Sequence, residues 1–370
     1  MGDKSLEPRN LEQKVGIKDD KNDHLNRRNF LKWLNVGIVL SGASIIGLFV
    51  WKPVYNTFIK EISGVERTKS LEEETRQKWQ DRLLKEFTGL EGVLEEKEDF
   101  IISRLKYVHN PIELRTWKDI EKISKDLTKD YVLIDDIDCC GRNFRPIGDD
   151  KNSFKGTLNG DGHKILNLKM NSDKDQSLFN YTDEESVIAN LRLENVHIEG
   201  DYVSGLVGIN KGCIYNCQVS GLVKARTSGA GLVLSNQGYI FNSENSSNVS
   251  GQSYAGGIVF SNFEGKLINS HNEGLVKGTK GSGGVAGISL RGIFKGCSSK
   301  GLVDGKEYVG GICGIDTESI FLECPVNERV NGSTNTGILI GYGVESLLIN
   351  YDQSNNLVGK DNYTIRMNIE

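Results

Sequence analysis

The sequence predicts a mainly β protein, a parallel β-helix (solenoid) of about eight coils with an N-terminal capping helix. Glycine is abundant and proline scarce, with 43 Gly and 5 Pro in 370 residues, against averages of about 7% and 5%. Four sequence columns recur every 26–27 residues in the C-terminal half. No stretch within a repeat is long or periodic enough for an amphipathic helix.

The four columns stay in phase over six repeats. The repeat-corner glycines are Gly205, Gly231, Gly257, Gly284, Gly311 and Gly337. A small-residue column holds Cys217, Ser243, Ser270, Cys297, Cys324 and Tyr351. Two apolar columns hold Ile214, Ile240, Leu267, Phe294, Phe321 and Leu348, and Val223, Val249, Val276, Val303, Val330 and Leu357. A fixed period of this length is typical of stacked repeats.

Short β-branched runs separated by Gly, Asn and Ser predict three short strands per coil. Neighbouring coils then pair as parallel strands about 4.8 Å apart, so each column becomes a ladder. We expect the repeat glycines, with Gly208 of the first repeat, to provide corners of positive φ. Proline is scarce because a ladder strand must donate its N–H groups. A β-propeller is disfavoured, since its blades need about 40 residues.

The first 52 residues predict a membrane anchor. Residues 1–25 are polar and are expected to form a disordered cytoplasmic tail, and residues 26–52 hold the anchor. Its apolar run from Leu34 to Trp51 would span about 27 Å as a helix, close to the hydrocarbon thickness of roughly 30 Å. Trp33 and Trp51 bracket that run, as interfacial tryptophans do. A buried core helix is the alternative.

A basic motif precedes the apolar run. The residues Arg27, Arg28, Phe30, Leu31 and Lys32 resemble a twin-arginine export signal. A simple basic flank that obeys the positive-inside rule is the alternative. Both interpretations predict a cytoplasmic N-terminus and an extracytoplasmic remainder. The run is not followed by an A-x-A-like site, which favours a retained anchor over a cleaved signal.

Residues 53–111 predict a helical stalk. Apolar residues recur at spacings of 3, 4 or 7 along one helical face: Trp79, Leu83, Phe87, Leu90, Leu94, Ile101, Leu105 and Val108. Gly89 and Gly92 weaken its middle by about 1 kcal/mol each, and the helix stops before Pro111. The apolar face would serve either a self-associating coiled coil or a helix lying on the next domain.

Residues 112–153 predict a segment that leads into the solenoid and caps it. Residues 116–127 form an amphipathic pattern, and a helix there would cover the open edge of the first coil. The solenoid itself is expected over residues 154–370, with two divergent coils before the regular repeats. The last ten residues alternate charged and apolar side chains and are expected to protect the far end.

The run Gly205-Leu206-Val207-Gly208 resembles the core of the GLUG motif, and the residues around it, 202–223, are similar to a whole repeat of that family. The similarity covers about residues 112–360. Later repeats depart from the motif, since the second glycine is lost at Leu234 and Phe260. The family occurs in bacterial surface adhesins and beside peptidase modules of large secreted proteins. The resemblance implies a fold and a location more than an activity.

The residues predict no catalytic group, cofactor or metal. The five histidines are too dispersed for a zinc-binding His-Glu-x-x-His helix, and Gly-x-Ser-x-Gly and Walker motifs are missing. Asp135, Asp136 and Asp138 form the nearest acidic cluster, which is interpreted as a polar turn, with calcium binding as the alternative. Nucleic acid is not expected as a partner, since the net charge is −5.

Tyr202, Tyr254 and Tyr308 share a column three residues before the repeat glycine, and they form a possible ligand strip. Simple edge packing is the alternative. The leading hypothesis is a membrane-anchored extracytoplasmic protein whose repeats present a non-catalytic binding surface, adhesin-like or scaffolding, for a glycan or a surface protein. The second hypothesis is a polysaccharide-active lyase or hydrolase, which needs carboxylates on neighbouring coils.

Overall fold

A computed structural model describes residues 81–82, 85–108, 110–351, 357–362 and 364–367. The predicted tail, twin-arginine-like signal and membrane helix, including Arg27, Arg28, Phe30, Leu31 and Lys32, lie outside the described residues. Within the described part, helices long and apolar enough to cross a membrane are not found.

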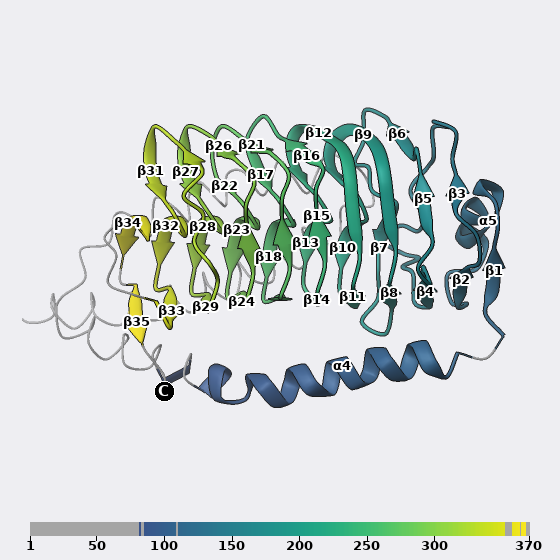
Figure 1. Ribbon diagram of the computed structural model, residues 1–370, viewed down its shortest axis with the longest axis horizontal. Helices are drawn as coiled ribbons and strands as arrows, with labels where there is room; N and C mark the ends of the chain where they lie inside the picture. The colour runs from purple at the N-terminus through teal and green to yellow at the C-terminus, as the bar shows by residue number, and fades with distance from the viewer. Residues whose placement is uncertain (1–80, 83–84, 109, 352–356, 363, 368–370) are drawn as a thin grey trace, which may run out of the picture. The chain divides into compact units, whose positions relative to one another are not determined.

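The described chain is a β-solenoid whose coils contribute strands to three parallel sheets (Figure 1). Sheet A has eleven strands: β1 (Ile112–Leu114), β2 (Tyr131–Leu133), β4 (Thr157–Asn159), β8 (Val187–Ala189), β11 (Cys213–Tyr215), β14 (Tyr239–Phe241), β19 (Lys266–Ile268), β24 (Ile293–Lys295), β29 (Ile320–Leu322), β33 (Leu347–Ile349) and β35 (Ile365–Met367). Sheet C has eight strands, which confirms the predicted number of about eight coils: β7 (Phe179–Tyr181), β10 (Val207–Asn210), β13 (Val233–Asn236), β18 (Val259–Phe263), β23 (Ala286–Leu290), β28 (Cys313–Thr317), β32 (Ile340–Val344) and β34 (Val358–Asn362).

Sheet B has sixteen strands and wraps the remaining sides of each coil. Its strands are β3 (Ile137–Asp138), β5 (Lys164–Leu166), β6 (Lys169–Asn171), β9 (Arg192–Ser204), β12 (Gln218–Ala230), β15 (Glu244–Asn245), β16 (Asn248–Ser250), β17 (Tyr254–Gly256), β20 (His271–Asn272), β21 (Val276–Lys277), β22 (Ser282–Gly283), β25 (Ser298–Ser299), β26 (Val303–Asp304), β27 (Glu307–Gly310), β30 (Val330–Asn331) and β31 (Thr334–Gly337).

The register confirms the apolar columns as interior ladders. Ile214 pairs with Ile240, and the column continues in register to Leu348. Val223 likewise leads to Val330. These side chains belong to one continuous buried core. Stacked identical side chains fill such a core because each finds the same neighbour above and below.

Two column assignments at the C-terminal end are wrong by register. Gly337 pairs with Gly310, so Ile338 takes the place after Gly311 that was predicted for Gly337. Leu357 does not follow Val330 in the ladder. Its carbonyl accepts the N–H groups of Leu339 and Ile340, so it lies beside those two residues. The cause for Leu357 is the last coil, in which Val358 pairs with Ile340 after only 18 residues instead of 27.

The repeat glycines occupy corners for a different reason from the predicted one. Gly205, Gly231, Gly257, Gly284 and Gly311 lack positive φ, but a Cβ on any of them would come within 2.0–2.4 Å of a carbonyl oxygen of the next coil. Gly208 is equally enclosed, since a Cβ there would lie 2.5 Å from the Asn180 carbonyl oxygen. Positive φ falls instead on an asparagine-rich column: Asn190, Asn216, Asn242, Asn269, Gly296, Glu323 and Asn350. Asparagine tolerates that conformation better than other residues with a side chain.

Buried asparagines form hydrogen-bonded ladders at two corners. At the corner between sheets C and A, Asn210 Nδ2 donates to Asn236 Oδ1 at 2.8 Å, and Asn236 donates to Asn262 at 3.0 Å. Within sheet B, Asn245 donates to Asn272 at 2.7 Å. Each amide thereby satisfies the next one, which removes the cost of burying it.

The N-terminal end of the core is closed as predicted, by a shorter helix. Helix α5 (Trp117–Lys122) continues into the 3₁₀ turn η1 (Ile123–Lys125), and Ile120 and Ile123 are buried in the solenoid core. The Asp119 carboxylate accepts the Thr116 N–H and hydroxyl, and its pKa is lowered to about 2, mainly by Lys122. At the far end, β34 and β35 continue sheets C and A instead of capping them.

The described helix of the predicted stalk does not project from the solenoid. Helix α4 (Leu90–Lys106) lies lengthwise on the outer face of sheet A (Figure 1), where Leu90, Leu94 and Ile101 are buried. The sheet side of this second core is apolar: Val187, Ala189, Cys213, Phe241, Ile268, Ile293, Ile320, Leu322, Leu347 and Ile349. Ion pairs of Glu91 with Lys295 and of Arg104 with Asp130 (3.3 Å) hold the helix at both ends. The prediction of a stalk is therefore wrong for α4. Of the two roles predicted for its apolar face, the structure shows the helix that lies on the next domain.

Candidate functional site

The two longest strands of the molecule lie side by side in sheet B. Strands β9 and β12 have 13 residues each, whereas all other described strands have two to five. The register between them shifts at one level, where β9 has two residues (Glu194 and Asn195) between paired positions and β12 has one (Ser220), so β9 bulges; Asn195 has φ 56° and Gly221 has φ 124°. A bulge bends a strand and redirects its side chains, so these two coils depart from the regular repeat.

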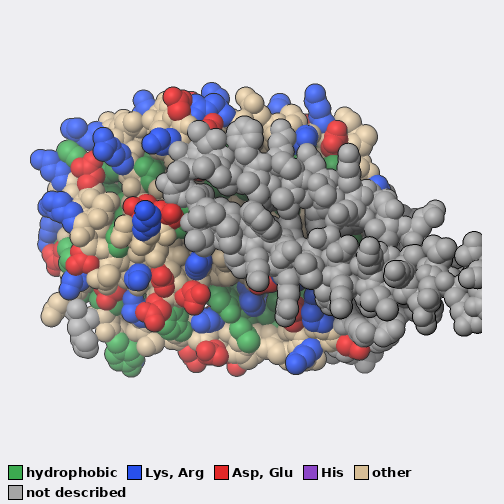
Figure 2. Space-filling model, turned by 180° about the vertical axis from the view of Figure 1, so that it is seen from behind, with side chains coloured by type: hydrophobic (Ala, Val, Ile, Leu, Met, Phe, Trp, Pro, Cys, Tyr) green, Lys and Arg blue, Asp and Glu red, His purple; other side chains and the backbone are tan. Residues whose placement is uncertain are grey.

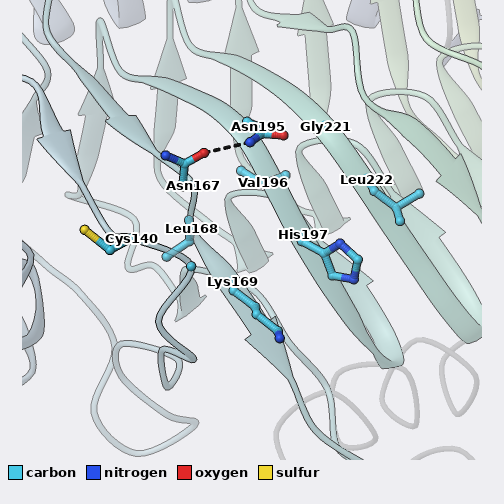
Figure 3. Close-up of a pocket in the computed structure, with 10 residues that line it drawn as sticks. Cys140, Asn167, Leu168, Lys169, Asn195, Val196, His197, Gly221 and Leu222 are labelled. Atoms are coloured by element: carbon cyan, nitrogen blue, oxygen red, sulfur yellow. Dashed lines mark hydrogen bonds between the residues drawn. The ribbon is translucent and has the colours of Figure 1, made fainter.

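An open hollow of about 460 Å³ lies at the bulge (Figure 3). It is lined by Cys140, Gly141, Asn167, Leu168, Lys169, Asn195, Val196, His197, Gly221 and Leu222. Only glycine fits at position 221, because a Cβ there would lie 2.3 Å from the Val196 carbonyl oxygen. Figure 3 shows Cys140 and His197 on opposite sides of the hollow, so they do not form a nucleophile–base pair.

A chain of polar groups leads into the hollow. Asn195 Nδ2 donates to Asn167 Oδ1 at 2.6 Å, and Asn167 Nδ2 donates to Asp138 Oδ1 at 2.9 Å. The bond from Asn167 is the main cause that lowers the pKa of Asp138. The chain ends at β12, where the Ser220 hydroxyl accepts the Asn195 N–H at 3.3 Å and Gly221 pairs with Val196. The predicted polar turn at Asp138 is thus one end of an amide ladder.

Beyond the hollow, polar side chains on β9 and β12 pair with one another. His197 Nε2 lies 3.1 Å from Glu199 Oε1, and Lys224 Nζ lies 3.6 Å from the same oxygen. All three side chains are outward, because Val196, Ile198 and Val223 point into the core.

Further along the same strands, three coils contribute to an arginine-centred cluster. Arg226 Nε donates to Asp201 at 2.8 Å and Nη1 donates to Asp173 at 2.8 Å. Asp175 lies on the neighbouring coil, where burial raises the pKa of its carboxyl to about 6, partly offset by a hydrogen bond with the Tyr202 backbone. The sequence columns missed this cluster because its residues occur once and do not repeat.

The three tyrosines of the predicted ligand strip share one row but do not stack on each other. Tyr202 and Tyr254 both pair with Ser228 in the register, and Gly281 separates Tyr254 from Tyr308. Tyr254 instead contacts Phe260 (centroids 5.9 Å apart), and Tyr308 contacts Tyr342 (5.6 Å). Tyr202 is half-buried beside Asp175, and burial raises its pKa. The strip is therefore interrupted, with Tyr202 at the arginine-centred cluster.

Among the described residues, groups of three or more metal-ligating side chains are not found. Six of the seven cysteines are buried thiols and Cys140 is exposed. Burial raises the pKa of Cys217 to about 12, which keeps its thiol protonated. These cysteines contribute to packing, as the small-residue column suggests.

No family model matches the chain. Halomucin from Haloquadratum walsbyi is 32% identical over 132 residues, which is 31% of this chain and 1% of that protein. A protein of Evansella cellulosilytica named as a Gly-rich membrane protein is 32% identical over 124 residues, 30% of this chain and 14% of that protein. The chain therefore spans a small part of both relatives.

Two solved structures are similar to this chain at low identity. One is a Bacteroides ovatus protein described as an immunoglobulin A1 protease, with a TM-score of 0.46 and 17% identity over 70% of this chain and 84% of that chain. The other is an IgA1 protease with a TM-score of 0.46 and 13% identity, covering 70% of this chain and 23% of that chain.

Proposed function

We propose that the protein is a membrane-anchored, extracytoplasmic repeat protein that presents a non-catalytic binding surface, adhesin-like or scaffolding. The observation that carries this proposal is the outward face of β9 and β12. Its hollow, its amide ladder and its exposed polar side chains converge where the register between β9 and β12 shifts.

The contrast with the solenoid's other sides supports a binding role for this face. Sheet A is covered by α4, whereas His197, Asn195 and Lys169 on sheet B are exposed. Lys/Arg and Asp/Glu side chains lie interspersed on the coloured part of the rear face in Figure 2, a mixed surface that keeps a displayed domain soluble. The proposed location rests on the apolar run Leu34–Trp51 and on the two partial relatives, one of which is named as a membrane protein.

Protease treatment of intact cells tests the location. Residues 112–370 should be digested from outside, while an epitope placed before Arg27 stays protected until the cells are lysed. Protection of residues 112–370 in intact cells would overturn the outward orientation. A glycan and protein array probed with the full-length chain then tests for a ligand. The matched variant is Asn195→Ala/His197→Ala, which should lose the array signal.

A specific observation favours a second candidate, a polysaccharide-active enzyme. Asp175 and Asp201 lie on neighbouring coils in different environments, since burial raises the pKa of Asp175 to about 6 while Asp201 accepts a hydrogen bond from Arg226. Carboxyl groups whose environments differ in this way can divide the roles of general acid and base. Asp175 would be the acid, and Asp201 would be the second carboxyl group of the pair.

Release of reducing or unsaturated ends from a polysaccharide panel tests this second candidate. Any activity should fall as the pH rises above about 6, because the acid must be protonated, and Asp175→Asn should abolish it. Activity retained by Asp175→Asn would exclude this assignment. Absence of released ends, with binding retained, favours the non-catalytic proposal.

A further inference from the structure

An uninterrupted row of outward side chains runs from the hollow along sheet B, parallel to the solenoid axis. We call it the Leu222 row. Register places one member on each of seven successive coils: Lys169, His197, Leu222, Asn248, Leu275, Leu302 and Arg329. The residue that follows each member points into the core in every coil but the last, where Val330 is half-buried against it. The row therefore lies on the surface.

The centre of the row is uncharged and partly apolar. Leu275 and Leu302 are 36% and 38% exposed, and they lie on adjacent coils. The Asn248 carboxamide oxygen accepts the Leu275 N–H at 3.4 Å, which ties one member to the next. Lys169 and Arg329 are the charged members, and they stand at the two ends.

The charges beside the row are neutralised within the protein. On one side Lys277 pairs with Asp304 at 3.3 Å, and Glu199 pairs with His197 and Lys224. On the other side Lys300 pairs with Glu273 at 3.4 Å. A strongly charged polymer would find few unpaired charged side chains here. The hydroxyl groups of a neutral polymer can instead form additional hydrogen bonds with side chains whose charges are already paired.

The spacing of the row also selects between kinds of chain. Its members repeat at the distance between parallel strands, about 4.8 Å. An extended peptide presents side chains on one face every two residues, at about 6.7 Å, and so falls out of step within two coils. The advance per ring in an extended, equatorially linked sugar chain is close to the strand spacing. The C–H face of each ring could rest on Leu222, Leu275 or Leu302.

We propose that the Leu222 row is a track for a neutral polysaccharide that lies along the solenoid axis, with one end of the chain in the hollow. This inference rests on the proposed function and specifies its ligand class. Asn195 and His197 then bind the end ring through hydrogen bonds, and the two exposed leucines bind rings further along. Each added ring contributes a small increment, so affinity depends on chain length.

The test measures affinity against oligosaccharide length. Full-length protein, in a detergent without a sugar headgroup, is titrated by calorimetry with cello-oligosaccharides and with the N-acetylglucosamine β-1,4 series, each from the disaccharide to the hexasaccharide. For at least one series, the affinity should increase progressively from the disaccharide to the hexasaccharide. Equal affinity at every length, binding of an anionic oligosaccharide series alone, or binding of neither neutral series would overturn the track.

Variants separate the two ends of the row. Leu275→Ser/Leu302→Ser should lower the affinity for the hexasaccharide about tenfold, or about 1.4 kcal/mol, and leave the affinity for the disaccharide unchanged. His197→Ala should weaken both. Gln218→Ser, outward on the same sheet but off the row, is the matched control and should change neither. If the glycan and protein array finds a ligand but the leucine variant binds the longest chain normally, the track fails and the proposed function stands.

Discussion

Sheets A and B share one interior but have opposite exteriors. Their inward columns are alike, with Ile, Leu, Phe and Val stacked in a single core. The outward columns of sheet A are apolar and lie under α4, while those of sheet B hold exposed polar side chains and a hollow. The inward residues therefore decide the fold, and the outward residues decide which side is covered and which side is presented.

The largest expected effect is on the covered side. Ile101→Ala removes a fully buried side chain between α4 and sheet A and should lower the free energy of unfolding by about 2–5 kcal/mol. Urea denaturation measures this loss. Leu302→Ala, on the open side, is the control and should change stability by less than about 0.5 kcal/mol. Equal effects of the two variants would contradict the assignment of covered and open sides.

The corner that joins sheet C to sheet A should depend on pH. Asp316 is fully buried where earlier coils carry the Asn210–Asn262 ladder, accepts the Ser346 hydroxyl at 2.6 Å, and has a pKa raised by burial to about 7. Because the folded pKa exceeds the unfolded value of 3.8, the folded state binds the extra proton. Stability should therefore fall as pH rises from about 4 to about 7.

Asp316→Asn should remove this dependence and raise the free energy of unfolding at pH 8 by about 2–4 kcal/mol, with little change at pH 4. Denaturation at the two pH values measures it. Asn236→Asp is the reverse variant, expected to destabilise at pH 8 only. A wild-type stability that does not change between these pH values would disprove the explanation.

A corner glycine on the boundary between sheets B and C gives a smaller effect. A Cβ at Gly257 would lie 2.0 Å from the Gly284 oxygen, so Gly257→Ala must shift the backbone and should cost about 1–3 kcal/mol. Thermal denaturation checks this loss. Unchanged stability would show that the coil spacing can widen at this corner.

The smallest expected effect is a gain. Gly92 lies in α4, and a Cβ added there would meet no atom of another residue within 4 Å. Gly92→Ala should therefore stabilise the protein by about 0.5–1 kcal/mol through helix propensity. Hydrogen exchange of the α4 amides should slow accordingly. Faster exchange would mean that α4 does not form the helix described.

Periodicity predicted the repeated parts of the molecule and missed those that occur once. The columns from Ile214 to Leu348 are interior ladders because every coil must solve the same packing problem. Leu357 was misplaced because the last coil shortens from 27 residues to 18, whereas Gly337 was misplaced by one residue because Ile338 takes the corner position after Gly311. The spacing of residues in the sequence does not reveal which strands the shortened last coil lacks.

The candidate site escaped prediction for the same reason. Arg226, Asp201 and Asp175 lie on three coils and occur at no equivalent position elsewhere, so a search for repeated carboxylates passes over them. The asparagines of positive φ were visible as a column before the cysteine and serine column, and their preference for that conformation is the signal that would have found the corners. The alternation of side chains along β9 indicates the exposed face once the strand is known to be 13 residues long.

The shortened last coil has a consequence for how the molecule can change in length. Both ends are specialised, one by α5 and the other by an 18-residue turn, while the coils from β10 to β32 repeat at 26–27 residues in sheet C. Duplication of one such unit in the middle would leave both ends intact and move them apart by one strand spacing. Internal coils can thus be added or removed without changing the ends, and the number of internal coils sets the length of the displayed face.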